Sequence, residues 1–219
     1  ICEGTQVGRD TAHDYPDEQA VARAMGAVFR NANGMGLVWC SSQNIDRLAT
    51  VADAAKLADR RVILDLYSAA VLRAANDASL PDPERDGLKV YLPRSQKRQI
   101  ITKRKFETSN PFYPYRVYAE HLKACAAKSV MIFRPSMYSE LRDADCVDGA
   151  ILISSLWSGY VKQDRTLPKM RDAGIEHRHI HTSGHATVDE LKRFIAAFPK
   201  SRIVPIHLED REGFMQLSP

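Results

Sequence analysis

Short apolar runs alternate with amphipathic segments between residues 10 and 160, and this alternation restricts the possible fold more than any other feature. The runs Gly36–Ser41, Arg61–Leu66 and Ser129–Phe133 are continuous and apolar, as expected for strands buried on both faces. Segments with the apolar spacing of helices separate them, for example Ser42–Leu57. Further strands are expected at Leu88–Leu92 and Gly149–Ser154, and further helices at Tyr67–Ala75, Val117–Lys128 and Asp164–Ala173. The pattern predicts an α/β fold with a mostly parallel sheet flanked by helices.

Composition narrows the class of protein. The chain is 44% hydrophobic and 26% charged, which is typical of a folded globular protein and not of a disordered one. No apolar run approaches the ~20 residues that a membrane-spanning helix needs, so we expect no membrane association. The four cysteines form no CxxC pair, which favours buried free thiols and a cytoplasmic location. Because the first residue is Ile1, within an expected strand, we expect a piece of a longer protein.

Five of the seven histidines lie between His177 and His207. An alternating strand is expected at Ile175–Ile180, followed by a polar turn. Thr187 and Glu190 have the spacing of a capping box, so a helix is predicted to begin there. Its inner face is predicted to carry Leu191, Phe194, Ile195 and Phe198. A short buried strand, Arg202–Ile206, should then end at His207.

Two of these histidines lie at positions that favour the binding of an anion or a metal ion. His185 precedes a predicted helix N-terminus, where free N–H groups favour an anion such as phosphate. His207 is expected at a strand end, and imidazole is the commonest metal ligand. The plainer interpretation is that both are ordinary histidines around a strand–helix–strand unit.

Three motifs in this order resemble a known family. The segment His181–Ala186 (HTSGHA) and the later Pro205–His207 (PIH) resemble motifs B and C of metallo-β-lactamase-fold hydrolases with a β-CASP domain, the ribonuclease J type. The opening Ile1–Thr5 (ICEGT) resembles motif A, an acidic residue at a strand end. The resemblance implies residues 1–9 as the end of a metallo-β-lactamase-type strand, 10–160 as a β-CASP-like domain and 161–219 as the return to the first domain.

The resemblance also implies site residues. Glu3 would be motif A and would orient His185, the motif B acid on the phosphate side. His207 would be the motif C zinc ligand, in a family whose complete site holds two zinc ions. His181 and Ser183 would lie near the scissile phosphate. Ser155, which follows a predicted buried strand, would lie at the mouth of the cleft between the family's two domains. The alternative for this segment is a tight turn with a packed Trp157.

The main metal motif of that family, HxHxDH, does not occur in these 219 residues. One ligand, His207, cannot make a zinc site, which needs about three protein ligands, so this chain alone should hold zinc weakly or not at all. We therefore expect part of a zinc-dependent phosphodiesterase, an RNA nuclease that is inactive as this fragment. The alternative is a non-catalytic module that binds nucleic acid or a protein. A metallo-β-lactamase-fold hydrolase of another ester is a third possibility.

A basic run marks a candidate nucleic-acid contact. Its six basic residues, without an intervening acid, are Arg94, Lys97, Arg98, Lys103, Arg104 and Lys105. The aromatic residues Phe112, Tyr113 and Tyr115 follow and are expected to be exposed. Cations beside aromatic rings can hold a phosphate backbone and stack bases, so RNA or another single-stranded nucleic acid is the expected partner. A solvated helix face is the alternative, and a homo-oligomer is left open.

Overall fold

The computed structural model describes residues 1–8 and 15–217. The predicted boundary between residues 9 and 10 therefore lies outside the described residues. The chain separates into two compact units: unit 1 combines Ile1–Asp14 with Ser183–Pro219, and unit 2 is Tyr15–Thr182.

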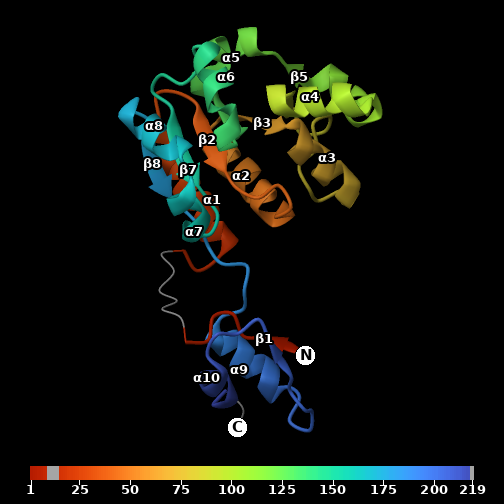
Figure 1. Cartoon of the computed structure of the whole chain (residues 1–219), viewed down its shortest axis with the longest axis vertical. Coiled ribbons are helices and arrows are strands. Elements are labelled where there is room, and N and C mark those ends of the chain that lie inside the picture. The colour runs from red at the N-terminus through yellow and green to blue at the C-terminus, as the bar shows by residue number, and fades with distance from the viewer. Residues whose placement is uncertain (9–14, 218–219) are drawn as a thin grey trace. The chain divides into compact units, whose positions relative to one another are not determined.

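Unit 2 is built on a seven-stranded sheet with the order β5-β4-β3-β6-β2-β7-β8. Figure 1 shows this sheet with its helices. Every neighbouring pair in it is parallel. The strands are β2 (Gly36–Trp39), β3 (Arg61–Asp65), β4 (Lys89–Tyr91), β5 (Arg116–Val117), β6 (Ser129–Ile132), β7 (Ile151–Ser154) and β8 (Glu176–His179). The predicted α/β fold with a mostly parallel sheet is confirmed.

Helices cover both faces of this sheet. They are α1 (Glu18–Asn31), α2 (Ile45–Leu57), α3 (Leu66–Ala75), α4 (Arg94–Lys103), α5 (Ala119–Cys125), α6 (Tyr138–Asp143), α7 (Ser158–Gln163) and α8 (Thr166–Asp172). Short 3-10 turns are η1 (Phe106–Thr108), η2 (Asn110–Tyr115), η3 (Ala126–Lys128) and η4 (Pro135–Met137). No helix in the described part of the chain is long and apolar enough to cross a membrane.

Alternate residues of the strands supply two separate cores. Val38 faces a core with α1, α2, α3 and Ile100 of α4, whereas its neighbour Leu37 faces a core with α5, α6 and α8. The same alternation separates Ile132 from Met131 on β6. The period of two in a strand therefore distributes a continuous apolar run between two helical layers, which explains why the centres of these runs are apolar on both faces.

The compact unit extends beyond the predicted boundary at residue 160. Strand β8 adds to the sheet edge through four residue pairs with β7, from Ile151↔Glu176 to Ser154↔His179. Met170 of α8 and Ile175 are buried in the core that contains α5 and α6. The segment 161–182 thus packs with the sheet. The assignment of the two units to β-CASP-like and metallo-β-lactamase-type domains stays a prediction.

Two local predictions around residue 112 were wrong. Phe112 is 4% exposed and packs in the core on the α1 side, with the Arg73 guanidinium 5.7 Å from its ring centroid. Tyr113 is exposed as predicted. The expected helix Val117–Lys128 is shorter, because Arg116 and Val117 pair with β4 as strand β5. Both errors arise from contacts with distant parts of the chain.

Unit 1 brings the two ends of the sequence together. Strand β1 (Cys2–Glu3) pairs in parallel with β9 (Pro205–Ile206), and helices α9 (Val188–Ala196) and α10 (Arg211–Met215) accompany them. Its core contains Cys2, Val7, Leu191, Ile195 and Phe214. The unit is small, so its strands depend on few contacts.

The predicted capping box at the start of α9 is present, with Thr187 and Glu190 as its partners. The prediction of a buried strand over Arg202–Ile206 is wrong, because β9 has two residues and Ile206 is 44% exposed. Phe194 and Phe198 of the predicted inner helix face are half exposed and contact each other. An apolar sequence predicts burial only where other residues cover it, and no described residue covers these side chains fully.

Candidate functional site

Glu3 is positioned by strand pairing within unit 1. The register sets Cys2 opposite Pro205 and Glu3 opposite Ile206, and the Gly4 N–H donates to the Ile206 carbonyl at 3.0 Å. The carboxyl ends of parallel strands meet at one edge, so Glu3 and His207 belong to the same edge of this small sheet. A link between them is the Thr5 hydroxyl, which donates to the His207 carbonyl at 3.1 Å.

The Glu3 carboxylate holds the segment that carries His185. One oxygen lies 2.9 Å from His185 Nδ1, and the other accepts the Ala186 N–H at 2.8 Å. The Gln6 amide donates to the His185 carbonyl at 3.3 Å. The His185 side chain is 50% exposed and that of Glu3 is 27% exposed. The imidazole is therefore anchored through one nitrogen, and half of its surface remains accessible to solvent.

The environment of Glu3 favours its charged form. Burial raises the pKa of the Glu3 carboxyl, but hydrogen bonds from Thr5 and Ala186 and the charge of His185 outweigh it and lower the pKa. Glu3 is consequently a carboxylate near neutral pH. An ionised partner at Nδ1 fixes the ring orientation and favours the tautomer that carries its proton on Nδ1.

The N-terminal donors of α9 are bound by protein carboxylates. Glu190 accepts from the Thr187 N–H at 2.8 Å, and the Thr187 hydroxyl accepts from the Glu190 N–H at 3.2 Å. Glu3 takes the Ala186 N–H just before the helix. The expectation that these donors hold a substrate phosphate is therefore not supported, because Glu3 and Glu190 already supply the anions that a helix N-terminus favours.

His207 follows β9 in a left-handed conformation, with φ of 51°. Residues other than glycine seldom adopt this backbone conformation, and those that do are concentrated at functional sites. The nearby Gly4 allows the close packing of this edge, because an added Cβ would lie 2.7 Å from Phe214 Cδ2 and 3.0 Å from Leu208 Cβ. His207 itself is exposed.

The described residues do not form a metal centre. No group of three or more His, Cys, Asp or Glu side chains with a geometry that could hold a metal ion occurs among residues 1–8 and 15–217. Zinc sites require about three protein ligands, so His207 by itself does not fit one. The second predicted family residue, His185, has its Nδ1 directed to Glu3.

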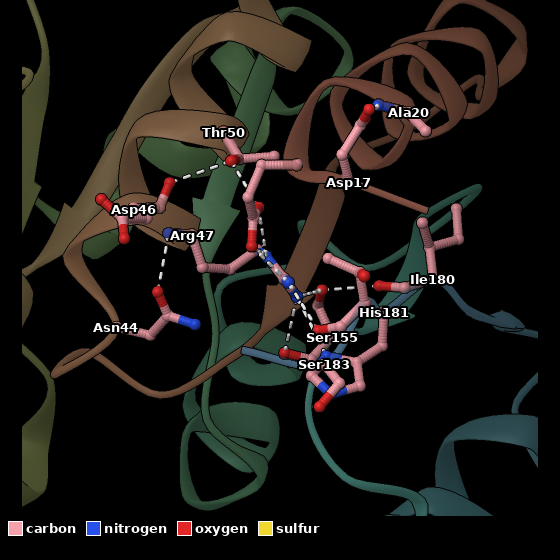
Figure 2. Close-up of polar contacts among 12 residues, drawn as sticks. Asp17, Ala20, Asn44, Asp46, Arg47, Thr50, Ser155, Ile180, His181 and Ser183 are labelled. Atoms are coloured by element: carbon pink, nitrogen blue, oxygen red, sulfur yellow. Dashed lines mark hydrogen bonds and ion pairs between the residues drawn. The ribbon is translucent and has the colours of Figure 1, made fainter. Parts of the chain in front are cut away.

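His181 and Ser155 of unit 2 meet a residue that the sequence analysis missed. Arg47 of α2 is fully buried and lies among the contacts in Figure 2. Its guanidinium donates to Glu18 of α1 at 2.7 Å and to the Thr182 carbonyl at 3.1 Å. It also lies 3.1 Å from His181 Nδ1 and donates to the Ser155 hydroxyl. The guanidinium thus joins α1, α2 and the carboxyl ends of β7 and β8.

The Ser155 hydroxyl already acts as both a hydrogen-bond donor and an acceptor within the protein. It accepts from Arg47 and donates to the Ile180 carbonyl at 2.5 Å, and the residue is 3% exposed. A buried hydroxyl with both roles filled serves the loop geometry and has no proton left for a phosphate. Ser183 belongs to unit 1, where its hydroxyl accepts the His185 N–H at 3.2 Å.

A sequence signal for Arg47 did exist. Arg47 stands three, four and seven positions before Thr50, Val51 and Ala54, so it lies on the inner face of α2. An arginine on that face is buried only with partners for its charge. The pKa of Glu18 is correspondingly low, because Arg47 and Thr50 outweigh its burial.

The six residues of the predicted basic run lie on or just after α4. Arg94 is paired with Asp143 at 2.8 Å on the surface. The other five, Lys97, Arg98, Lys103, Arg104 and Lys105, are exposed and have no ion pair among the described residues. Arg104 ends the helix in a left-handed conformation. This part of α4 therefore offers unpaired positive charge to solvent.

Residues 175–212 match the family model of the Zn-dependent metallo-hydrolase RNA specificity domain. The match covers β8, α9, β9 and both His185 and His207, and it leaves out Glu3 and most of unit 2. It supports a relationship to the metallo-β-lactamase/β-CASP hydrolases without singling out the ribonuclease J type. No curated protein matches the chain.

The lowered pKa of Glu3 gives a pH-dependent stability for unit 1. Glu3 is deprotonated in the folded state to lower pH than in the unfolded chain, so its contribution is present above the ordinary glutamate pKa of about 4.3 and is lost as pH falls through the folded value. We expect Glu3→Gln to destabilise unit 1 at neutral pH and to make little difference in acid. Urea unfolding followed on the Leu191 and Ile195 methyl NMR signals measures this.

The control is Glu209→Gln, which removes an exposed carboxylate from the same unit. A Glu3→Gln effect of equal size at both pH values would contradict the proposed charge interaction.

Proposed function

We propose that this chain supplies the RNA-specificity part and a proton-donating residue of a zinc-dependent RNA phosphodiesterase of the ribonuclease J type. The observation that carries the proposal is the Glu3–His185 pair, held at 2.9 Å inside the unit whose His185 and His207 lie in the matched segment. The finer assignments of activity and substrate rest on the resemblance of the three motifs.

In this proposal His185 donates the proton. Glu3 fixes Nδ1, which leaves Nε2 as the nitrogen that can face a substrate in the half-exposed ring. In this hydrolysis a water oxygen bonds to phosphorus, and the imidazolium transfers its Nε2 proton to the departing oxygen as the other phosphorus–oxygen bond breaks. The Glu3 carboxylate stabilises the positive charge before transfer. General acids of this kind contribute roughly 10²–10⁴-fold to a rate.

His207 is proposed as one zinc ligand of the complete enzyme. The described residues do not complete a site around it, so the other ligands, including an HxHxDH motif, are proposed to come from sequence outside this chain. The half-exposed Ile206, Phe194 and Phe198 of unit 1 agree with a further protein layer there. Bound zinc would supply Lewis-acid chemistry to the phosphodiester.

His181 and Ser183 remain proposed substrate contacts, each in its own unit. The contacts of Ser155 indicate a structural role, since its hydroxyl connects the Arg47 guanidinium with the Ile180 carbonyl. Ser155 is therefore proposed to position the Arg47 guanidinium and, through it, the His181 ring. The proposed cytoplasmic location and the oligomeric state rest on the sequence alone.

The competing proposal is a binding module without catalysis. It is favoured by one observation, that the described residues lack a group of metal-ligating side chains. In that case Glu3 and His185 would only connect the two ends of the chain, and the exposed cations of α4 would carry the function. Zinc content and turnover of the longer protein separate the two proposals.

Two histidine substitutions in the longer protein should have different effects on turnover and zinc content. His185→Ala should lower RNA turnover roughly 10²–10⁴-fold with zinc content unchanged, because it removes a proton donor. His207→Ala should lower zinc content together with turnover, because it removes a ligand. Elemental analysis and single-turnover cleavage of labelled RNA measure both effects.

Lys200→Ala is the control, since this exposed residue lies in unit 1, the unit that contains both histidines. Loss of zinc in His185→Ala would reverse the two assignments. Unchanged turnover in both variants would favour the binding module.

The cations after α4 give a second test, of RNA contact. Replacing Lys103, Arg104 and Lys105 by Ala should weaken RNA binding, because three exposed unpaired charges are removed. The slope of log affinity against log salt should fall by roughly 0.7 for each phosphate of a single strand that the protein no longer neutralises. Fluorescence anisotropy with labelled RNA over a salt series measures it, and an unchanged slope would make this surface a solvated helix face only.

A further inference from the structure

Four neighbouring strands of unit 2 each begin beside a cation. Arg61 is the first residue of β3 and Arg116 of β5, Lys89 is the first of β4, and Lys128 directly precedes β6. The sheet order β5-β4-β3-β6 places these strands side by side. The register staggers them, because Lys89 lies opposite Ile63, two residues after Arg61, and Arg116 lies opposite Val90. With adjacent strands ~4.8 Å apart, the four residues form a staggered row of positive charge at the amino-terminal edge of the sheet.

The row lines one open cavity of about 1250 Å³, which we call the amino-edge furrow. Its other charged side chains are largely engaged. Arg85 pairs with Asp86 at 2.8 Å, and Arg60 donates to the Gly34 carbonyl at 2.6 Å. The remaining charged residues of the lining are Asp53, Lys56 and Asp59. Seven basic and three acidic side chains thus face the furrow, an excess of positive charge.

The four cations of the row have no ion pair among the described residues. Arg116 shows this most clearly, because its Nε is buried and has no hydrogen-bond partner. Its guanidinium lies 5.1 Å from the ring centroid of Tyr118, which holds it in place by a cation–π contact. A buried donor without an acceptor is costly, so the guanidinium is not fully satisfied by the protein. Guanidinium groups form charge-assisted hydrogen bonds to phosphate.

A simpler role for such cations would be to neutralise the carbonyl ends of α2 and α5, which lie at this edge. The contacts do not support that role for the row. Arg30 donates to the Leu57 carbonyl at the end of α2 at 3.2 Å, and Arg60 donates to the Ala32 and Gly34 carbonyls after α1. Arg61, Lys89 and Lys128 make no such bond among the described residues. The row is therefore left for a ligand.

We propose that the amino-edge furrow binds the phosphate backbone of single-stranded RNA, at the edge opposite to the carboxyl ends that carry Ser155 and Arg47. This rests on the proposed function, which supplies RNA as the substrate. An extended row in an open cavity suits a chain of phosphates more than one compact anion. Compact phosphates are commonly bound at helix N-termini. Here α2 lines the furrow with Ala52, Asp53 and Lys56 of its carboxyl-terminal half, and α5 with Ala124 and Cys125 at its carboxyl end as well as with His121.

The test compares Arg61→Gln/Lys128→Gln with Lys162→Gln/Lys169→Gln, two exposed lysines outside the furrow. Affinity for fluorescein-labelled oligouridylate is measured by anisotropy over a salt series, with EDTA present to prevent hydrolysis. The furrow variant should lose about 1.4 from the slope of log affinity against log salt, at about 0.7 for each of two phosphates. The Lys162→Gln/Lys169→Gln control should have the same slope as the wild-type protein.

Cys125 offers a local readout that does not depend on a variant. It lines the furrow and is partly exposed, whereas the other three cysteines are buried. Oligouridylate should slow the alkylation of Cys125 in the original protein. Pyrophosphate should do so only at far higher concentration.

Unchanged slope in the furrow variant, or no protection of Cys125 by oligouridylate, would overturn the proposal. Equal slope changes in both variants would also overturn it, as a general charge effect. If pyrophosphate protected Cys125 as strongly as RNA does, the ligand of the furrow would be a compact polyphosphate and not RNA. None of these results touches the proposed function, which fails separately if His185→Ala leaves turnover unchanged.

Discussion

The carboxylate of Glu3 is the interaction on which unit 1 depends. It contacts His185 Nδ1 and the Ala186 N–H, and so connects the first strand with the start of α9, more than 180 positions later. The β1–β9 ladder has only two residue pairs, so strand pairing alone is a weak link between the chain ends. One ionised side chain therefore both closes the unit and orients the imidazole that we propose as the acid.

In unit 2 a buried cation connects distant segments, as the Glu3 carboxylate does in unit 1. Arg47 is buried among α1, α2 and the loops after β7 and β8, where it replaces lost hydration with Glu18, Ser155 and Thr182. Removing one partner of such a buried group leaves a charge or donor without compensation, which costs more than the contact contributed. The network therefore fixes the loops at this end of the sheet, His181 included.

The regular elements could be predicted from local sequence. Continuous apolar runs gave the parallel sheet, and the spacing of Thr187 and Glu190 gave the start of α9, because both signals are short-range. The contact of Glu3 with His185 was implied by the resemblance of their motifs to the family. Phe112, the short exposed β9 and the buried Arg47 could not be located in this way, since each depends on which distant elements pack against it. The amino-edge furrow appears only after the sheet order places β5, β4, β3 and β6 together.

The central claim is that Glu3 holds His185 through Nδ1 and leaves Nε2 for chemistry. A two-bond ¹H–¹⁵N correlation spectrum of the His185 ring, recorded at alkaline pH, tests this most directly. The geometry predicts the proton on Nδ1 in the original protein and a shift toward the Nε2–H tautomer in Glu3→Gln. A proton on Nε2 in both proteins would contradict the claim.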